Sequence, residues 1–214
     1  MNNVFLVLSS TIHLWGSKNE NHKLNKNDLY VLDKCSQLED KKVQLIAIVQ
    51  NDDGYQLLQE ASSYSFDTAV RILISPDTLA TPRTVSKTVV DYLNYIHADS
   101  YSVVFGCNDQ DVNLSFIPGQ LAGARGLEFY DDAETIQQPG VYLFHNSLDE
   151  RRIQTLKSRI ELKKKLLPDF SVSEPEIPSI KLVNAVSFSK NEDQMSGEES
   201  NAQKLDHILK EFER

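Results

Sequence analysis

Short, nearly continuous apolar runs alternate with segments of helical period along the N-terminal part of the chain. The runs are rich in Val, Ile and Leu and predict strands buried on both faces, over residues 4–10, 43–49, 69–75 and 101–106. The segments between them carry apolar residues every three or four positions, which predicts helices over 28–39, 54–65 and 82–98. This alternation predicts an α/β fold built on an open, mostly parallel twisted sheet with helices on both faces.

The stretch 103–128 passes from a buried strand through a polar loop into a short helix of small residues. Gly106 ends the strand, and Gly126 suits the left-handed position that follows a helix. In an open parallel sheet, ligands bind beyond the carboxyl ends of the strands, where helix N-termini favour anions. The stretch therefore predicts a nucleotide phosphate site, although Leu114 and Phe116 are apolar. Tight packing of the helix on the sheet without a ligand is the alternative interpretation.

The character of the sequence changes after this helix. A further strand is predicted at 141–144, and the segment 150–167 is compatible with a helix or a strand, with the helix fitting better. Capping-box spacing and an apolar stripe predict a helix over 196–214. The expected domain organisation has a nucleotide-binding-like α/β domain, an irregular extension and connector, and a C-terminal helix, covering residues 1–145, 146–195 and 196–214.

Charge and cysteine content narrow the range of functions. The formal net charge of −9 argues against a nucleic-acid partner, because phosphate contacts need clustered Lys and Arg. The two cysteines, Cys35 and Cys107, stand far apart without a CxxC motif, so neither a disulfide framework nor a zinc site is expected. No run reaches the roughly 18 apolar residues of a membrane span. A cytoplasmic location is therefore predicted.

Catalytic residue types form no recognised pattern. There is no GxSxG motif, and the five histidines are scattered along the chain. A Walker A loop is absent, and the loop after the first strand lacks the GxGxxG fingerprint of dinucleotide-binding enzymes. The sequence therefore does not predict an enzyme.

Five short motifs, in the same order along the chain, resemble those of the β subunit of electron transfer flavoproteins. "NKNDLYVLDKC" is similar to the family's N-P-x-D-x-Y-A-L-E-x-A, and "DTLATPRT" to its D-T-L-A-T-x-x-T. "DVNLSFIPGQLA" resembles D-G-D-T-A-Q-V-G-P-Q-I-A of the electron-bifurcating members, and "SEPEIPSI" resembles N-E-P-R-Y-P-S-L. The last motif, "GEESNAQKLDHILKEF", is similar to the helix that closes many family members. The matches extend over most of the chain.

This resemblance implies a Rossmann-like fold of the adenine-nucleotide α-hydrolase-like kind. It implies a heterodimer with an electron transfer flavoprotein α-like subunit, which carries electrons from acyl-CoA or other dehydrogenases. FAD would be shared with the α subunit. The β-type chain would hold its own adenine nucleotide, which is AMP in ordinary members and a second FAD in bifurcating ones. The chain itself would be an electron-carrier subunit without covalent catalysis.

The resemblance also implies which residues would meet the nucleotide. Asn25 would lie near the adenosine, Thr81 and Thr84 would meet phosphate oxygens at a helix N-terminus, and the loop 111–120 would wrap the phosphates. The full set of expected cofactor-binding residues is Ser9, Asn25, Thr81, Thr84, Gly106, Asp111, Asn113, Ser115, Gly119 and Gln120.

Several positions depart from the family pattern at this expected site. Leu114 and Phe116 replace a threonine and a glutamine, Val112 replaces a glycine, and Glu176 replaces an arginine. The family's basic residue in the first loop gives way to serine, and each lost charged hydrogen bond would weaken binding by about 1.5–3 kcal/mol. A cofactor-free structural or regulatory homologue that keeps only the partner interface is therefore an alternative. A free-standing adenine-nucleotide sensor is another, although its glycine-rich phosphate loop is missing.

Overall fold

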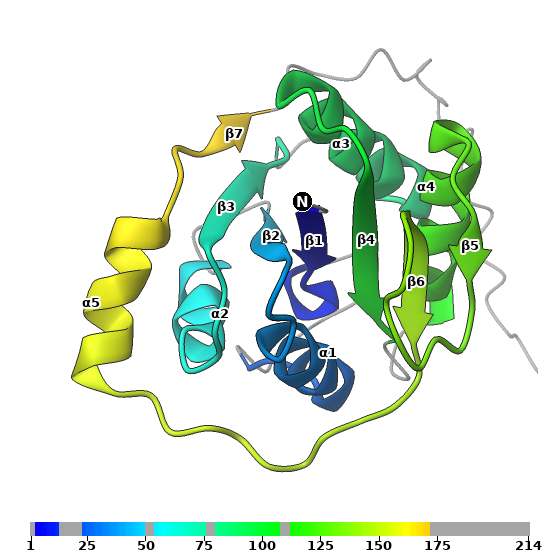
Figure 1. Ribbon diagram of the computed structural model, residues 1–214. Coiled ribbons are helices and arrows are strands. Elements are labelled where there is room, and N and C mark those ends of the chain that lie inside the picture. Colours follow the sequence, from blue (N-terminus) through cyan, green and yellow to red (C-terminus); the bar gives the residue numbers. More distant parts are fainter. Residues whose placement is uncertain (1–2, 13–22, 50–53, 76–79, 108–111, 172–214) are drawn as a thin grey trace, which may run out of the picture. The chain divides into compact units, whose positions relative to one another are not determined.

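The computed structural model describes residues 3–12, 23–49, 54–75, 80–107 and 112–171 (Figure 1). These residues belong to the first of two compact units, 1–176 and 177–214. The helix expected over 196–214 and the motif at 173–180 lie outside the described residues.

A seven-stranded, entirely parallel sheet forms the centre of the first unit (Figure 1). Its strands lie side by side in the order β5-β6-β4-β1-β2-β3-β7. The expected α/β architecture is therefore confirmed, and each predicted strand is present. The strands are β1 (Asn3–Val7), β2 (Lys42–Val49), β3 (Thr68–Leu73), β4 (Tyr101–Gly106), β5 (Phe129–Tyr130), β6 (Gly140–Phe144) and β7 (Phe170–Ser171).

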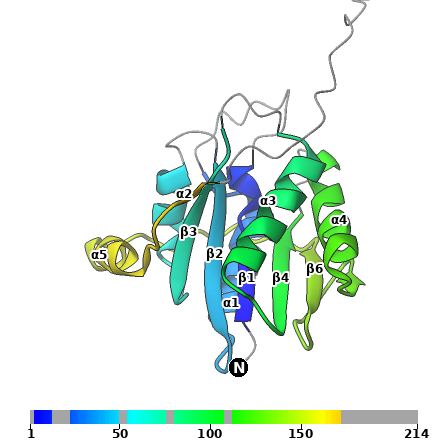
Figure 2. The same ribbon diagram turned by 90° about the horizontal axis from the view of Figure 1, so that it is seen from above.

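Helices cover both faces of the sheet (Figures 1 and 2). The side chains of β1 show why two cores exist, since Val4 and Leu6 belong to one apolar cluster while Phe5 and Val7 belong to the other. One core contains residues of α3 and α4, and the other contains residues of α1, α2 and α5. The helices are α1 (Lys26–Ser36), α2 (Gly54–Ala61), α3 (Pro82–Tyr95), α4 (Phe116–Arg125) and α5 (Leu156–Lys165), with short 3₁₀ turns η1 (Ser9–Thr11) and η2 (Val112–Ser115).

Local sequence signals set the ends of α3 and α4. The side chain of Thr81 accepts a hydrogen bond from the N–H of Thr84 at 3.2 Å, and Pro82 takes the first helical position. Gly126 ends α4 with φ of 63°, in the left-handed region that favours glycine. The N–H of Leu127 then bonds the carbonyl of Ala122 at 3.0 Å, which completes a Schellman-type end.

A long segment carries the chain across the sheet from β6 to α5 and β7 at the opposite edge (Figure 1). The ambiguous stretch 150–167 contains α5, so the preferred helical interpretation is confirmed. A capping box at Thr155 begins α5, and Leu162 is its one fully buried side chain. We call the segment 145–155 the strap.

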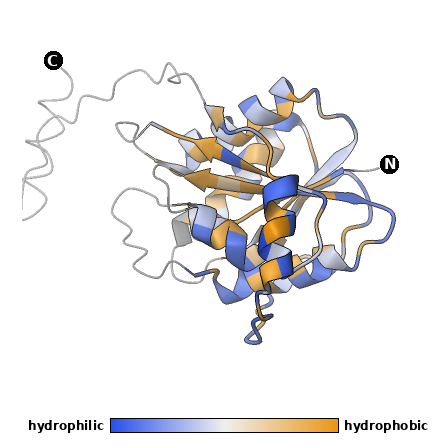
Figure 3. Ribbon diagram, turned by 90° about the vertical axis from the view of Figure 1, so that its left-hand side faces the viewer, coloured by the Kyte–Doolittle hydropathy of each residue, from blue (hydrophilic) through white to orange (hydrophobic). Residues whose placement is uncertain are grey.

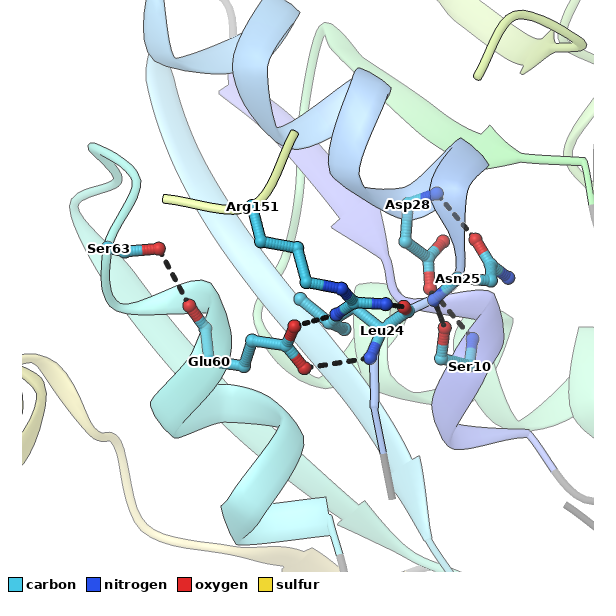
Figure 4. A network of polar contacts seen from close by, with 7 residues as sticks. All are labelled: Ser10, Leu24, Asn25, Asp28, Glu60, Ser63 and Arg151. Carbon is cyan, nitrogen blue, oxygen red and sulfur yellow. Dashed lines mark hydrogen bonds and ion pairs between the residues drawn. The ribbon is translucent and has the colours of Figure 1, made fainter. Parts of the chain in front are cut away.

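Arg151 fastens the strap to the body of the fold (Figure 4). Its guanidinium pairs with the carboxylate of Glu60 on α2 and donates to the backbone carbonyl of Leu24 at 2.7 Å. Glu60 in turn accepts from the N–H of Leu24 at 2.9 Å. One arginine thus joins the strap, α2 and the segment that enters α1.

Candidate functional site

The strand order reverses between β1 and β4, which is where an open parallel sheet offers a binding crevice. From β1 the chain moves outward through β2 to β3, and it then returns through α3 to β4 on the other side of β1. The carboxyl ends of β1 and β4 therefore mark the expected nucleotide site. The segments 13–22, 50–53, 76–79 and 108–111, which follow the first four strands, lie outside the described residues, and with them Asp111.

Within the part of the chain that the structure describes, the space between these two strand ends is closed. It has a cavity volume of about 0 Å³, so it does not admit a water molecule. Leu114 is 5% exposed and packs into this space, whereas Phe116 is 59% exposed. Its lining is mostly apolar and consists of Ser9, Ile12, Phe105, Gly106, Cys107, Leu114, Ser115, Ile117 and Leu143.

The polar groups that follow β1 are turned toward Asp28, a fully buried carboxylate at the start of α1. Ser9 donates to it through its N–H at 3.1 Å and its hydroxyl at 2.8 Å. Ser10 does the same at 2.8 Å and 2.6 Å. Burial raises the pKa of Asp28, and these four donors act against that rise. The described part of the first loop therefore directs its donors to a buried carboxyl group of the chain itself.

Asn25 completes this network (Figure 4). Its side-chain oxygen caps α1 by accepting the N–H of Asp28 at 2.6 Å. Its side-chain amide donates to the hydroxyl of Ser9 at 2.9 Å, and its backbone N–H donates to the hydroxyl of Ser10 at 2.7 Å. Each serine hydroxyl thus donates to Asp28 and accepts from Asn25. The structure uses Ser9 and Asn25, both expected at the nucleotide, to hold α1 against β1.

Gly106 is required by the packing of α1. A Cβ at this position would lie 2.7 Å from the backbone carbon of Asn27 and 2.9 Å from the backbone nitrogen of Asp28. The end of β4 and the first turn of α1 therefore touch backbone to backbone. This contact explains the glycine without a ligand.

The remaining expected residues lie on α3 and α4. The hydroxyls of Thr81 and Thr84 are 2.9 Å apart at the N-terminus of α3, and Thr84 is buried. Gln120 is exposed on α4, where its side-chain oxygen is 3.5 Å from the hydroxyl of Ser86 on α3. Gly119 also lies on α4, and a Cβ there would make ordinary contact with the ring of Phe129 at 3.9 Å.

The expected residues thus fall into two groups. Ser9, Gly106 and Ser115 line the closed space, and the side-chain amide of Asn25 donates to the hydroxyl of Ser9. Thr81, Thr84, Gly119 and Gln120 belong to the α3–α4 pair, while Asn113 lies in η2. Within the described ranges, the N-terminus of α3 is the part of this site best suited to an anion.

Asp28 is the buried acceptor at the centre of this network, and the sequence analysis did not include it among the expected site residues. The sequence does contain a signal for such an acceptor, namely the adjacent serines Ser9 and Ser10 at the end of the first strand. Their hydroxyl groups can donate hydrogen bonds to a buried carboxyl group. The segment 13–22 separates them from Asp28 along the chain, so periodicity alone did not connect them.

The two cysteines are buried and are not joined by a disulfide, and they belong to the apolar cores on opposite faces of the sheet. Burial raises the pKa of Cys35 to about 12, although Lys41 lowers it in part. The Cys35 thiol is therefore protonated at neutral pH and is a poor nucleophile.

Among the residues that the structure describes, no group of three or more His, Cys, Asp or Glu side chains is arranged to hold a metal ion. No helix in these ranges combines the length and the apolar character needed to span a bilayer.

Comparison with known proteins identifies no family: no family model matches the chain, and no curated protein is significantly similar to it. The resemblance to electron transfer flavoprotein β subunits therefore depends on the ordered motifs alone.

Proposed function

We propose that this chain is a cofactor-free homologue of electron transfer flavoprotein β subunits that acts by binding an α-like protein partner. The observation that carries the proposal is Leu114, which closes the space at the switch point where a β-type chain would hold its adenine nucleotide. The order of the motifs and the Rossmann-like sheet support the kinship.

The chemistry next to Leu114 supports the same conclusion. A nucleotide phosphate needs donors at the end of β1, and the donors of Ser9 and Ser10 already serve the buried carboxylate of Asp28. Redirecting them would leave that carboxylate buried without hydrogen bonds, at a cost of several kcal/mol. When Asp28 is ionised, its negative charge would also repel a phosphate bound at this position.

The surface of α5 and the strap supports a role in partner binding. Ile153 lies in the strap and is 88% exposed, and Leu156 and Ile160, one turn apart on α5, are 76% and 49% exposed. Figure 3 shows this side of the molecule, where hydrophobic positions lie between hydrophilic ones. Large exposed apolar side chains in one stripe are typical of protein interfaces. We call these three residues the apolar stripe.

Calorimetry on the purified chain tests the absence of a nucleotide site. Titration with AMP and with FAD should give no binding at micromolar concentrations. Micromolar affinity for either compound would overturn the proposal, because the closed space would then open for a nucleotide in solution.

Co-expression with an electron transfer flavoprotein α-like subunit from the same organism tests partner binding. Size-exclusion chromatography should show a heterodimer, with any flavin absorbance contributed by FAD on the partner. Leu156→Glu should abolish the complex, because it places a charge in the apolar stripe. Phe116→Glu is the control, since it introduces the same charge at another exposed apolar side chain, on α4, and should leave the complex intact.

A second candidate function is FAD-dependent electron transfer with AMP bound at the N-terminus of α3. The hydroxyl pair of Thr81 and Thr84 at that helix end favours it. In this case the co-expressed complex would retain AMP through purification, and Thr81→Val would release it. A complex that contains no AMP after gentle purification would exclude this alternative.

A further inference from the structure

An open polar pocket lies far from the closed switch point, beside the amino-terminal end of β3. Its walls are the segment 62–66, which joins α2 to β3, and the inward side of α5 with the end of the strap. Its volume is ≈ 320 Å³, which lies within the range of small-molecule sites. The pocket therefore has room for a small metabolite, in contrast to the switch point.

The charged side chains that line this pocket are mostly cationic. Arg152, Lys157 and Lys165 face a single acid, Glu161, although the whole chain carries a net charge of −9. The side chain of Lys157 is 85% exposed, and its Nζ is as far as 4.0 Å from the carboxylate of Glu161, so this ion pair is weak. A local excess of positive charge on an acidic protein indicates an anionic ligand.

The other two cations are held in place while keeping donors for a ligand. Arg152 bonds Asp33 at 2.5 Å and stacks over the ring of Tyr64 at 4.6 Å. Lys165 donates to the backbone carbonyl of Phe66 and lies over its ring at 4.8 Å. An arginine has five N–H donors and a lysine three, so these contacts use only part of their capacity.

Hydroxyl groups supply further hydrogen-bonding capacity around the pocket. The hydroxyl of Ser62, in the segment after α2, donates to the hydroxyl of Ser158 on α5 at 3.3 Å. Thr155 lines the pocket at the N-terminus of α5, where the helix dipole favours negative charge. The remaining hydroxyl residues of the wall are Ser63 and Ser65.

Tyr64 provides an independent sign of a missing ligand. The residue lines the pocket and is 3% exposed, and its hydroxyl has no hydrogen-bond partner among the described residues. Burial raises the pKa of Tyr64, so the phenol stays protonated at neutral pH and remains a donor. A buried donor without an acceptor is uncommon in native proteins and indicates a polar partner that this pocket can admit.

We propose that this pocket binds a small phosphate monoester, whose oxygens accept hydrogen bonds from Arg152, Lys157 and the hydroxyl of Tyr64. The site is independent of the proposed partner binding, because it uses the inward side of α5 and not the apolar stripe. Such a site would let a phosphorylated metabolite influence the strap and α5.

Calorimetry of the full chain with inorganic phosphate and O-phosphoserine at low ionic strength tests the site. Saturable binding with one ligand per chain is expected, with glutamate binding at least about tenfold more weakly. Lys157→Gln should weaken phosphate binding about tenfold, since it removes a charge-assisted hydrogen bond. Arg159→Gln removes an equal charge from the same helix outside the pocket and should change the affinity less than twofold.

Tyr64→Phe separates a ligand-binding role of the hydroxyl from a structural one. Without phosphate, this variant should melt at the same temperature as the wild type or higher, because it removes an unsatisfied buried hydroxyl. It should nevertheless bind phosphate several-fold more weakly and show a smaller phosphate-induced rise in Tm.

Three results would overturn the proposal. The first is no saturable phosphate binding below about 10 mM, which is the weakest affinity that a specific site of this kind would show. The second is an equal loss of affinity in Lys157→Gln and Arg159→Gln, which would indicate a diffuse counter-ion effect. The third is unchanged phosphate affinity in Tyr64→Phe.

Discussion

Leu114 and Phe116 lie two positions apart and have opposite environments. Consecutive residues of a helical segment are turned by about 100°, so residues two apart point to nearly opposite sides. The junction of η2 and α4 therefore turns Leu114 into the closed space and Phe116 to the surface. The sequence showed that both residues were apolar, but it could not show which of them filled the expected site.

Leu114→Ala should lower the free energy of unfolding by about 2–5 kcal/mol, because it leaves a cavity in a closed apolar region. Phe116→Ala should change it by less than about 1 kcal/mol, since most of its ring is in solvent. Urea unfolding followed by circular dichroism measures both. Equal effects of the two substitutions would show that Leu114 does not fill this space in solution.

Asp28 shows why the expected role of Ser9 could not be tested by sequence reasoning. Composition and spacing identify Ser9 as a polar residue after a strand, and a ligand or a neighbouring carboxylate would explain it equally well. Only the fold brings Asp28 within 2.8 Å of the Ser9 hydroxyl. The resemblance pointed to Ser9 and Asn25, and the packing of α1 determines what their side chains bind.

The stability of the protein should depend on pH through Asp28. Its pKa is raised above the usual 3.8 in the folded state, so the folded protein binds more protons between pH 3.8 and the folded pKa. The free energy of unfolding therefore falls as pH rises through this window.

Asp28→Asn removes this titration and serves as the reference. The stability difference between wild type and Asp28→Asn should shrink as pH rises through the same window and stay constant above it. Urea titrations at a series of pH values measure the difference, in which other carboxyl groups cancel. A difference that grows with pH would mean that the four donors outweigh burial and lower the pKa.

At the scale of elements, the spacing of apolar residues and the residue types of each segment predicted the strands β1 to β4 and β6 and the helices α1 to α4. Continuous apolar runs identify strands buried on both faces, and these form most of the sheet. The strands β5 and β7 contain only two residues each, which is too short for any period to show. The helix α5 was ambiguous because apolar residues occur on its outward side as well as its inward side.

Gly123 inside α4 and Gly126 at its C-terminal cap should respond to alanine with opposite signs. Gly123 lies inside the helix with open space around a new Cβ, so Gly123→Ala should stabilise the protein by about 0.5–1 kcal/mol. Gly126 has φ of 63°, so Gly126→Ala should destabilise it by about 1 kcal/mol through backbone strain alone. Thermal unfolding of the two variants distinguishes them. The same sign for both would contradict the left-handed end of α4.

At the scale of the whole unit, the strap determines where the far edge of the sheet is completed. The strap begins after β6 on one side of the sheet and leads to α5 and β7, which lie beside β3 on the other side. Arg151, within the strap, pairs with Glu60. The backbone N–H of Leu167 bonds the carbonyl of Ala69 at 2.8 Å, and Arg71 pairs with Asp169. These contacts join residues remote in sequence, so local patterns could not predict them.

Arg151→Ala should loosen this edge selectively. It removes the guanidinium that joins Glu60 and Leu24, and we expect a loss of about 1–2 kcal/mol, because the arginine is 40% exposed. Native-state hydrogen exchange should show weaker protection at Leu166 and Leu167, with unchanged protection in β1 and β4.

The control for this experiment is Arg159→Ala, which removes an arginine of α5 whose guanidinium donates to the side-chain oxygen of the nearby Gln154. It should leave the exchange of Leu166 and Leu167 unaltered. Equal deprotection in both variants would show that Arg151 does not anchor the strap.

β7, which pairs with the outer edge of β3, is synthesised long after β3. Ile72 pairs with Phe170, and ribosomes add about 5–20 residues per second. The interval between their synthesis is therefore on the order of 5–20 s. During that time β3 presents the unpaired edge of a growing sheet, which is a template for intermolecular strand pairing. A nascent chain stalled before residue 170 should consequently need a chaperone to stay unaggregated, whereas one released after β7 should not.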